Sequence, residues 1–393
     1  MKRREKGGVS LIQSVKKFFR ETDKILLLLC FALSAIGIIA VSSATHTSVS
    51  DDSFFSRDAR VMLIAVIAGA ALALFVSLFD YDIFLKLWFV VGIVCLGMML
   101  VLFTPLGCAP SGRDDSRCWI KITSSLYFQP SEIVKIGFVI TFAAHCEKVR
   151  RENIDFKSVI FLCVHALIYI GLVVLTGDMG SALIFIMMFI AMIFTAGVHW
   201  IYFVVGPLLV AAVLPVAWYK VFGTIQRNRI LALFYPELYP NEIYQQNLAE
   251  KAMQNGGLLG TGLFKGVYSK TVPECQNDMV LSVIGEEFGF IGAVVLMLIF
   301  VLLIIKIMRV GRKSGSFAAR IMCSGIAFML GSQVIVNIGM CTKLLPVIGI
   351  TLPFISAGGS SSLCLYIAIG VVLSVARHSQ EVPVSDFIYR GKY

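Results

Sequence analysis

Residues 279–307 read MVLSVIGEEFGFIGAVVLMLIFVLLIIKI, a run that is apolar along almost all of its length. An α-helix needs roughly 20 such residues to cross a bilayer, so this run is long enough for one crossing. The whole chain shares this character: of its 393 residues, 58% are hydrophobic and 15% are charged, with a mean hydropathy of +0.85. This composition is typical of a polytopic membrane protein and excludes a soluble globule built on one core. A β-barrel would instead show short alternating segments.

Similar apolar runs along the chain predict an all-α polytopic membrane protein with about ten transmembrane helices. Basic residues gather beside these runs, as the positive-inside rule requires of cytoplasmic loops. The net charge of +10 therefore reflects membrane topology, and we expect no nucleic acid as a partner. The same rule places both termini in the cytoplasm. The predicted spans are 25–44, 61–79, 87–105, 132–147, 158–175, 180–197, 201–222, 279–307, 318–340 and 360–377.

The pattern divides the chain into three parts. Residues 1–24 carry eight Lys and Arg and form a basic cytoplasmic segment, either an amphipathic helix on the membrane surface or a solvated tail. Residues 25–377 form a single transmembrane domain, whose first span lacks the features of a cleavable signal. Residues 378–393 form a short cytoplasmic tail. The cytoplasmic loops hold Lys148, Arg150, Arg151 and Lys157, then Lys306, Arg309, Arg312, Lys313 and Arg320, and finally Arg377.

One large polar loop, residues 223–278, lies outside the membrane between spans seven and eight in this topology. A long structureless connection is usually functional or disordered, and clustered glycines suggest tightly packed backbone. Asp278 lies just before the apolar start of the next span, and Glu286 and Glu287 follow two turns later. Acids near a helix start stabilise its dipole, which is one interpretation of these two glutamates. We expect any chemistry to lie in this loop.

Two shorter outside segments also carry unusual polar residues. In residues 118–135, CWIKITSSLYFQPSEIVK, Pro130 suits the first turn of a helix, with Glu132 and Lys135 one turn apart. These two either form a local ion pair or serve in function, because ionisable residues at span depth are costly. In residues 176–181, TGDMGS, Asp178 either caps the next helix or takes part in binding, and these roles do not exclude each other.

Residues 333–361, QVIVNIGMCTKLLPVIGITLPFISAGGSS, combine amides with a Pro/Gly-rich stretch. Gln333 and Asn337 are four residues apart, on one face of a span, where amides bond to neighbouring helices. The stretch that follows cannot be a regular helix. Broken backbone at membrane depth is tolerated only when it is buried in protein or lines a wet cavity. The sequence therefore predicts a cavity that opens to the outer face.

The ten cysteines show no CxxC pair and no Cys/His spacing suited to zinc. Most are expected to be small apolar fillers of helix interfaces. Cys108 and Cys118 share one outside loop, so a disulfide between them is one alternative and two free thiols are the other.

At these segments the sequence resembles the SEDS family (shape, elongation, division, sporulation), whose members include FtsW, RodA and SpoVE. The most specific matches are NIG at 337–339, LLPVIGITLPFIS at 344–356 and GGSS at 358–361. The resemblance covers nearly the whole chain. Further blocks in the family's order are FQPSE at 128–132 with Lys135, GDMGS at 177–181, and, in and after the large loop, Tyr244–Gln245, Ala252, Gly256–Gly257, Pro273–Glu274, Asp278 and GEEFGFIG at 285–292.

The resemblance implies a peptidoglycan glycosyltransferase in the bacterial cytoplasmic membrane. Family members polymerise lipid II, a disaccharide-pentapeptide on undecaprenyl pyrophosphate, at the outer face of that membrane. The implied partners are a class B penicillin-binding protein, which crosslinks the new strand, and membrane lipid. The family's essential aspartate lies in an LPExHTDF-like motif, which reads VPECQNDM at 272–279 here. The resemblance therefore implies Asp278 as the catalytic residue, and a carboxylate near the acceptor hydroxyl can act as its general base.

The leaving pyrophosphate needs positive partners, for which Lys135 is the better candidate and Lys270 the second. A divalent cation is the alternative, although no ligand cluster in the sequence establishes one. The expected substrate-binding residues are Lys135, Glu132, Trp119, Gln129, Asp178, Gln245, Lys270, Glu274, Gln333, Asn337, Ser356 and Ser360.

Several positions depart from the family's pattern. Gln276-Asn277 replaces the usual His-Thr, and Met279 replaces Phe. Cys118 precedes Trp119 where Arg is typical, Asn255 opens the usual SGG, and Ala357 replaces an aromatic residue. These changes keep the proposed base but alter its surroundings. The chain is therefore either a divergent but active polymerase, which we favour, or a family member that has lost activity.

Two rival functions follow from the same sequence. Broken helices and intramembrane polar residues also suit a transporter, here a lipid II flippase, although its site is expected near the membrane midplane and not in an outer loop. The altered residues around Asp278 favour a non-catalytic scaffold for the penicillin-binding protein.

Overall fold

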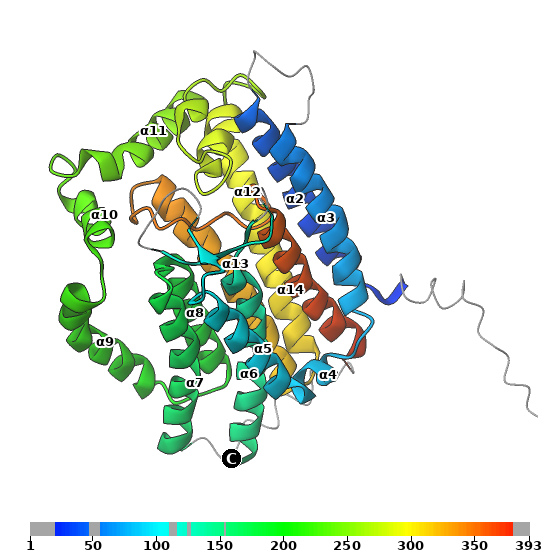
Figure 1. Ribbon diagram of the computed structural model, residues 1–393. Coiled ribbons are helices and arrows are strands. Elements are labelled where there is room, and N and C mark those ends of the chain that lie inside the picture. The colour runs from blue at the N-terminus through cyan, green and yellow to red at the C-terminus, as the bar shows by residue number, and fades with distance from the viewer. Residues whose placement is uncertain (1–19, 47–55, 110–115, 124–126, 153–154, 380–393) are drawn as a thin grey trace, which may run out of the picture.

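The structure is a computed structural model that describes residues 20–46, 56–109, 116–123, 127–152 and 155–379. Within these residues every predicted span corresponds to one helix (Figure 1). The predictions for residues 1–19 and 380–393 lie outside the described residues. The helices that match the spans are α2 (Lys24–Thr45), α3 (Arg57–Val76), α5 (Trp88–Val101), α6 (Pro130–Glu152), α7 (Phe156–Leu175), α8 (Met179–Thr195), α9 (Ile201–Lys220), α12 (Val280–Lys313), α13 (Phe317–Cys341) and α14 (Gly359–His378).

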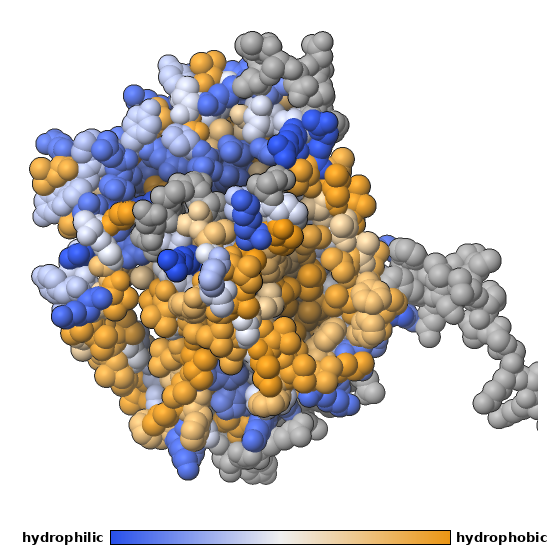
Figure 2. All heavy atoms as spheres, viewed as in Figure 1, coloured by the Kyte–Doolittle hydropathy of each residue, from blue (hydrophilic) through white to orange (hydrophobic). Residues whose placement is uncertain are grey.

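Among the described residues, seven helices are long and apolar enough to cross a membrane. Of the other three, α5 and α8 are shorter apolar helices, and α6 carries charged residues in its first and last turns. On the face shown in Figure 2, a hydrophobic band separates a polar end over α10 and α11 from polar residues at the opposite end. The helical membrane architecture is confirmed, whereas the count of ten crossings stays a prediction.

The centre of the bundle is α13, whose side chains are buried along most of its length. It packs against α12, α8 and α6. On the other side, α14 lies against α3 at close range, because a Cβ on Gly370 would come within 2.9 Å of the Cα of Ala73. Small residues at such crossings let the backbones of membrane helices approach.

The large loop is not structureless, contrary to the reading of it as one long connection. It contains α10 (Thr224–Phe234), α11 (Pro240–Gly256) and a short 3₁₀ turn, Ser269–Thr271, and it lies over one end of the bundle (Figure 1). Pro240 begins α11 at the position where its missing N–H costs nothing. Since α11 packs against both α12 and α13, the loop is an ordered layer on the bundle.

The fold is also not purely helical. Three short antiparallel strands precede α6: β1 (Gly107–Cys108), β2 (Trp119–Lys121) and β3 (Tyr127–Phe128), in the order β1-β2-β3. Cys108 pairs with Trp119 across β1 and β2, and no disulfide joins Cys108 to Cys118. Of the two alternatives for these cysteines, the structure does not take the disulfide.

Candidate functional site

Asp278 lies at the joint between the large loop and the start of α12. Its side chain is largely buried, with the residue 9% exposed. The amide Nε2 of Gln245, on α11, lies 3.5 Å from Asp278 Oδ1. On the other side, a Cβ on Gly349 would come 4.0 Å from Asp278 Oδ2 and would meet no other atom within 4 Å. The carboxylate is therefore enclosed by protein on one side and borders the exposed backbone of Gly349 on the other.

The backbone of Asp278 is fixed by Asn337, which lies on α13. Asn337 Nδ2 donates to the carbonyl of Asp278 at 2.7 Å and to the carbonyl of Ile350 at 2.8 Å. One buried amide thus joins three segments: the end of the loop, α13 and the irregular stretch between α13 and α14. This confirms that the amide bonds to neighbouring segments, and it explains why a polar residue is retained in a buried helix.

The same irregular stretch, residues 342–358, is anchored from several sides. Gln246 Nε2, on α11, donates to the carbonyls of Met340 and Leu345. Arg229 Nη1, on α10, donates to the carbonyl of Val347 at 3.0 Å. The amide of Ala357 donates to the carbonyl of Gln276 at 2.8 Å. The non-helical backbone is therefore held by loop residues, as broken backbone at membrane depth requires.

Helix α12 is itself broken near the site, at Gly289, whose φ is +68°. The backbone groups freed by the break bond to the loop that follows α11. Phe290 and Ile291 donate to the carbonyls of Gly257 and Leu258, while the amides of Thr261 and Gly262 donate to the carbonyls of Glu286 and Glu287. Such a break persists when the backbone amides and carbonyls that lose their helical partners form hydrogen bonds elsewhere. Here the new partners belong to the part of the large loop that follows α11.

The two glutamates do not stabilise the start of α12, since the first turn of this helix contains no acidic residue. Glu286 instead accepts hydrogen bonds from three successive loop amides, those of Val267, Tyr268 and Ser269, at 2.7–3.1 Å. Asn255 Nδ2 donates to the same carboxylate at 2.9 Å, and Glu287 accepts from Ser43 on α2. The helix-dipole interpretation was wrong, because these acids lie past the first turn and are directed into the loop.

A second polar group joins the starts of α6 and α8. Asp178 caps α8 by accepting from the amide of Ser181 at 2.9 Å. Its other oxygen accepts from Gln129 Nε2 at 2.7 Å and from Ser131 Oγ at 3.2 Å. A Cβ on Gly180 would come 2.8 Å from the carbonyl of Ile348. The start of α8 therefore packs on the same irregular stretch that borders Asp278.

Glu132 and Lys135 form an ion pair in the first turns of α6. Lys135 Nζ lies 2.8 Å from Glu132 Oε1, and the two side chains are 1% and 9% exposed. Pro130 begins this helix, as its sequence position predicts. The ion-pair alternative is confirmed, whereas contact with substrate is untested. Because Lys135 is buried and already paired, it is not an open anion site as it stands.

The remaining candidates have separate contacts, none of which joins them to Asp278. Exposed Lys270 donates to the carbonyl of Phe264, and exposed Glu274 accepts from Asn277 Nδ2. Trp119 lies in the sheet before α6. Ser356 Oγ accepts from the amide of Leu352, Ser360 lies in the first turn of α14, and Gln333 is buried with no partner for its Oε1 among the described residues.

Cys275, three residues before Asp278, is not suited to catalysis as a nucleophile. Burial raises the pKa of the Cys275 thiol, so it is a poor nucleophile at neutral pH. Among the described residues, no group of three His, Cys, Asp or Glu is placed to hold a metal ion. Gln246, Arg229 and Gly349 were not predicted from the sequence, because their roles depend on contacts between residues that are far apart along the chain.

Three comparisons with known proteins agree with this architecture. A family model described as a cell cycle protein, FtsW/RodA/SpoVE, matches residues 20–381. The chain is 33% identical to the probable peptidoglycan glycosyltransferase FtsW of Trichlorobacter lovleyi, over 95% of this chain and 99% of that one. It is 30% identical to the peptidoglycan glycosyltransferase MrdB of Escherichia coli, over 73% of this chain and 76% of that one.

Solved structures are similar as well. One belongs to a study of how a peptidoglycan synthase complex coordinates polymerization and crosslinking; it shares 25% identity and a TM-score of 0.75, covering 91% of this chain and 98% of that one. The rod shape determining protein RodA of Thermus thermophilus shares 24% identity and a TM-score of 0.67, covering 92% and 98%. The latter likeness supports the fold.

Proposed function

Because this chain belongs to the FtsW/RodA/SpoVE family, we propose that it extends glycan strands from lipid II at the outer face of a bacterial cytoplasmic membrane. The chain is a multi-pass membrane protein, and its curated relatives are named peptidoglycan glycosyltransferases. The observation that carries the site assignment is the position of Asp278. Its carboxylate is mostly buried and borders the exposed backbone of Gly349, and its backbone carbonyl accepts a hydrogen bond from Asn337.

In the proposed reaction, the acceptor sugar hydroxyl attacks the anomeric carbon of the donor. A new C–O bond forms as the bond from that carbon to the pyrophosphate oxygen breaks, and the hydroxyl proton passes to Asp278. A positioned base of this kind contributes roughly 10²–10⁴-fold in rate. Gln245 Nε2 lies close to one oxygen of Asp278, and the acceptor is proposed to approach the carboxylate from the side of Gly349, where the backbone is exposed.

Several substrate contacts are part of the same proposal. The pyrophosphate is assigned to Lys135 and, as a second candidate, to Lys270. Lys135 would act from within its pair with Glu132, at the polar starts of α6 and α8. Gln129, Asp178 and Trp119 lie in this region and are proposed to contact the disaccharide or its carrier.

A divalent cation is the alternative partner for the leaving pyrophosphate. The described residues around Asp278 do not form a dedicated metal cage. Mg²⁺ is often held by one or two carboxylates plus substrate phosphates, so any cation here would come with the pyrophosphate. We assign no step to it, and the dependence of polymerisation on Mg²⁺ in the presence of a chelator tests the point.

The proposed partner is a class B penicillin-binding protein that crosslinks the product. A structural neighbour from a peptidoglycan synthase complex with both polymerization and crosslinking supports this pairing. The proposed orientation has the large loop outside and the termini in the cytoplasm. The cations near the end of α12, Lys306, Arg309, Arg312 and Lys313, support it by the positive-inside rule.

Two rival functions are separable by experiment. The purified protein, with its cognate penicillin-binding protein, is given lipid II, and glycan length is followed on gels. Long glycan supports the polymerase. If no glycan forms while a known family polymerase is active in the same assay, the proposal fails. Translocation of labelled lipid II across proteoliposomes would then support the flippase, and its absence the scaffold.

A further inference from the structure

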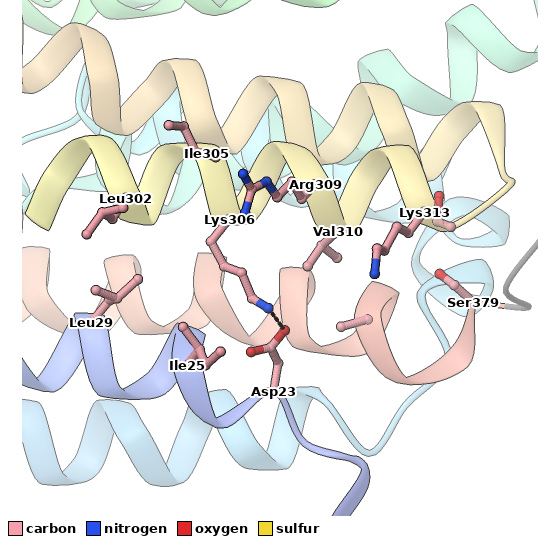
Figure 3. Close-up of a pocket in the computed structure, with 12 residues that line it drawn as sticks. Asp23, Ile25, Leu29, Leu302, Ile305, Lys306, Arg309, Val310, Lys313 and Ser379 are labelled. Carbon is pink, nitrogen blue, oxygen red and sulfur yellow. Dashed lines mark ion pairs between the residues drawn. The ribbon is translucent and has the colours of Figure 1, made fainter. Parts of the chain in front are cut away.

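A recess lies beside the last turns of α12, whereas the large loop joins the start of that helix. Figure 3 shows the residues that line the recess. It is bordered by the start of α2, the end of α12 and the end of α14, and its cavity volume is about 450 Å³. Nothing in the proposed transferase reaction uses it.

Helix α12 supplies one face of side chains to this recess: Leu302, Ile305, Lys306, Arg309, Val310 and Lys313. Residues spaced by three and four lie on one face of a helix. The character of this face changes along the helix: Leu302 lies opposite Leu29 of α2, whereas Lys306, Arg309 and Lys313 lie toward the end of α12 (Figure 3). One end of the recess is therefore apolar and the other basic.

The basic end of the recess is lined by three cationic side chains, Lys306, Arg309 and Lys313, and by one carboxylate, Asp23. Asp23 already caps α2 by accepting from the amide of Leu26 at 3.1 Å, and it pairs with Lys306 at 2.7 Å. Arg309 and Lys313 are exposed, and no carboxylate lies within 4.0 Å of either among the described residues. Two cations thus remain beside an apolar groove without an acidic partner from the described chain.

Helix electrostatics and topology explain this arrangement only in part. Cations stabilise the last turn of a helix through its dipole, but that effect fades beyond one turn. Lys313 is in the last turn of α12, while Lys306 lies nearly two turns from its end. The positive-inside rule explains why cations gather at this end, but not why three of them share one face that lines a recess.

We propose that this recess binds one anionic phospholipid of the cytoplasmic leaflet. Its phosphodiester would lie against Arg309 and Lys313, since guanidinium and ammonium groups form charge-assisted hydrogen bonds with phosphate. Its acyl chains would run along Leu302, Leu29 and Ile25 toward the middle of the membrane. Basic pockets between membrane helices at the cytoplasmic side are suited to such head groups.

The test titrates the full-length purified protein in detergent with phosphatidylglycerol, and separately with phosphatidylcholine of the same acyl chains, using native mass spectrometry. Arg309→Gln removes one proposed phosphate contact. Arg312→Gln is the matched control, because Arg312 is exposed at the same helix end but does not line the recess. We expect preferential binding of phosphatidylglycerol, weakened about tenfold by Arg309→Gln and less than about twofold by Arg312→Gln.

Four results would overturn the proposal. Equal affinity for the two lipids would remove the role of charge, and equal loss in both variants would mean diffuse surface attraction. Displacement of the lipid by millimolar inorganic phosphate would indicate a free-anion site. If phosphatidylglycerol binds only after residues 380–393 are removed, the tail is the occupant. Both variants replace exposed side chains, so their melting temperatures are expected to match that of the wild type.

Discussion

At the scale of single residues, the site depends on amides that hold backbone in place. Gln333 and Asn337 both belong to α13 and both are buried, yet they differ in what they contact. Asn337 Nδ2 donates to two carbonyls, whereas Asn337 Oδ1 and Gln333 Oε1 both lack a partner among the described residues. The two side-chain amides lie one helical turn apart, and the Nδ2 group of Asn337 is the one that holds backbone of the site.

This contrast gives a matched pair of substitutions. Asn337→Leu leaves two buried carbonyls short of a donor, at a cost of about 1–3 kcal/mol for each group, and should lower the melting temperature and displace Asp278. Gln333→Leu should leave stability unchanged or raised. Thermal unfolding in detergent, followed by the polymerisation assay, checks both. A stable Gln333→Leu protein with impaired polymerisation would assign Gln333 to substrate, as its sequence position suggests.

The ion pair of Glu132 with Lys135 leads to a second prediction. Removing one partner of a buried pair costs about 3–5 kcal/mol, because the other charge is left uncompensated. Lys135→Met and Glu132→Gln should each be strongly destabilised, and the double variant should recover most of the loss. If Lys135 contacts pyrophosphate, the recovered double variant will show a raised KM for lipid II. An unchanged KM would make the pair purely structural.

At the scale of elements, the break in α12 is the feature that joins the loop to the bundle. A Cβ on Gly289 would come 2.4 Å from the amide nitrogen of Gly260 and 2.5 Å from the carbonyl oxygen of Leu258. Its φ of +68° is also unfavourable for other residues. The break and the loop that covers it should therefore be sensitive to any side chain at this position.

We expect Gly289→Ala to destabilise the protein by at least about 2 kcal/mol, from backbone strain and the clash together. Gly171→Ala on α7 is the control, since a Cβ there meets no atom within 4 Å. Limited proteolysis should cut the loop faster in Gly289→Ala only. Equal proteolysis rates in the two variants would show that the break does not order the loop.

The sequence predicts elements better than it predicts the contacts between them. All ten apolar runs became helices, because length and hydropathy are local properties. The order within residues 223–278 was missed, since α11 is polar and its buried face, with residues such as Ala249 and Ala252, has its partners on distant helices. For the same reason Glu286 could be noticed from sequence but was assigned to the helix dipole and not to the loop amides.

At the scale of the whole molecule, the two polar ends have different chemistry. One end holds the loop, Asp278 and the starts of α6 and α8, and the other holds the cations of α12. The sequence placed Asp278, Gln245 and Asn337 in one site through family resemblance, and the structure brings these three together. Lys270 makes no hydrogen bond to these three residues and donates instead to the carbonyl of Phe264. Closeness along the chain therefore did not predict closeness in space for this residue.

The proposed orientation makes a prediction for intact cells. In a background with Cys108 and Cys118 replaced by serine, Lys265→Cys in the loop should react with a membrane-impermeant maleimide. Arg312→Cys, at the opposite end, should react only after the membrane is permeabilised. Both positions are exposed, so the side of the membrane on which each cysteine lies decides whether it is labelled. Labelling of Arg312→Cys in intact cells would reverse the topology.

The most direct test of the central claim compares lipid II polymerisation by the wild type, Asp278→Asn and Glu237→Gln, each with the cognate penicillin-binding protein. Glu237 is the control, because it is an exposed acid of the same loop and is not one of the expected substrate-binding residues. We predict that Asp278→Asn, with an unchanged melting temperature, loses activity by about 10²-fold or more, while Glu237→Gln loses little. Equal polymerisation by wild type and Asp278→Asn would contradict the assignment of Asp278 as the base.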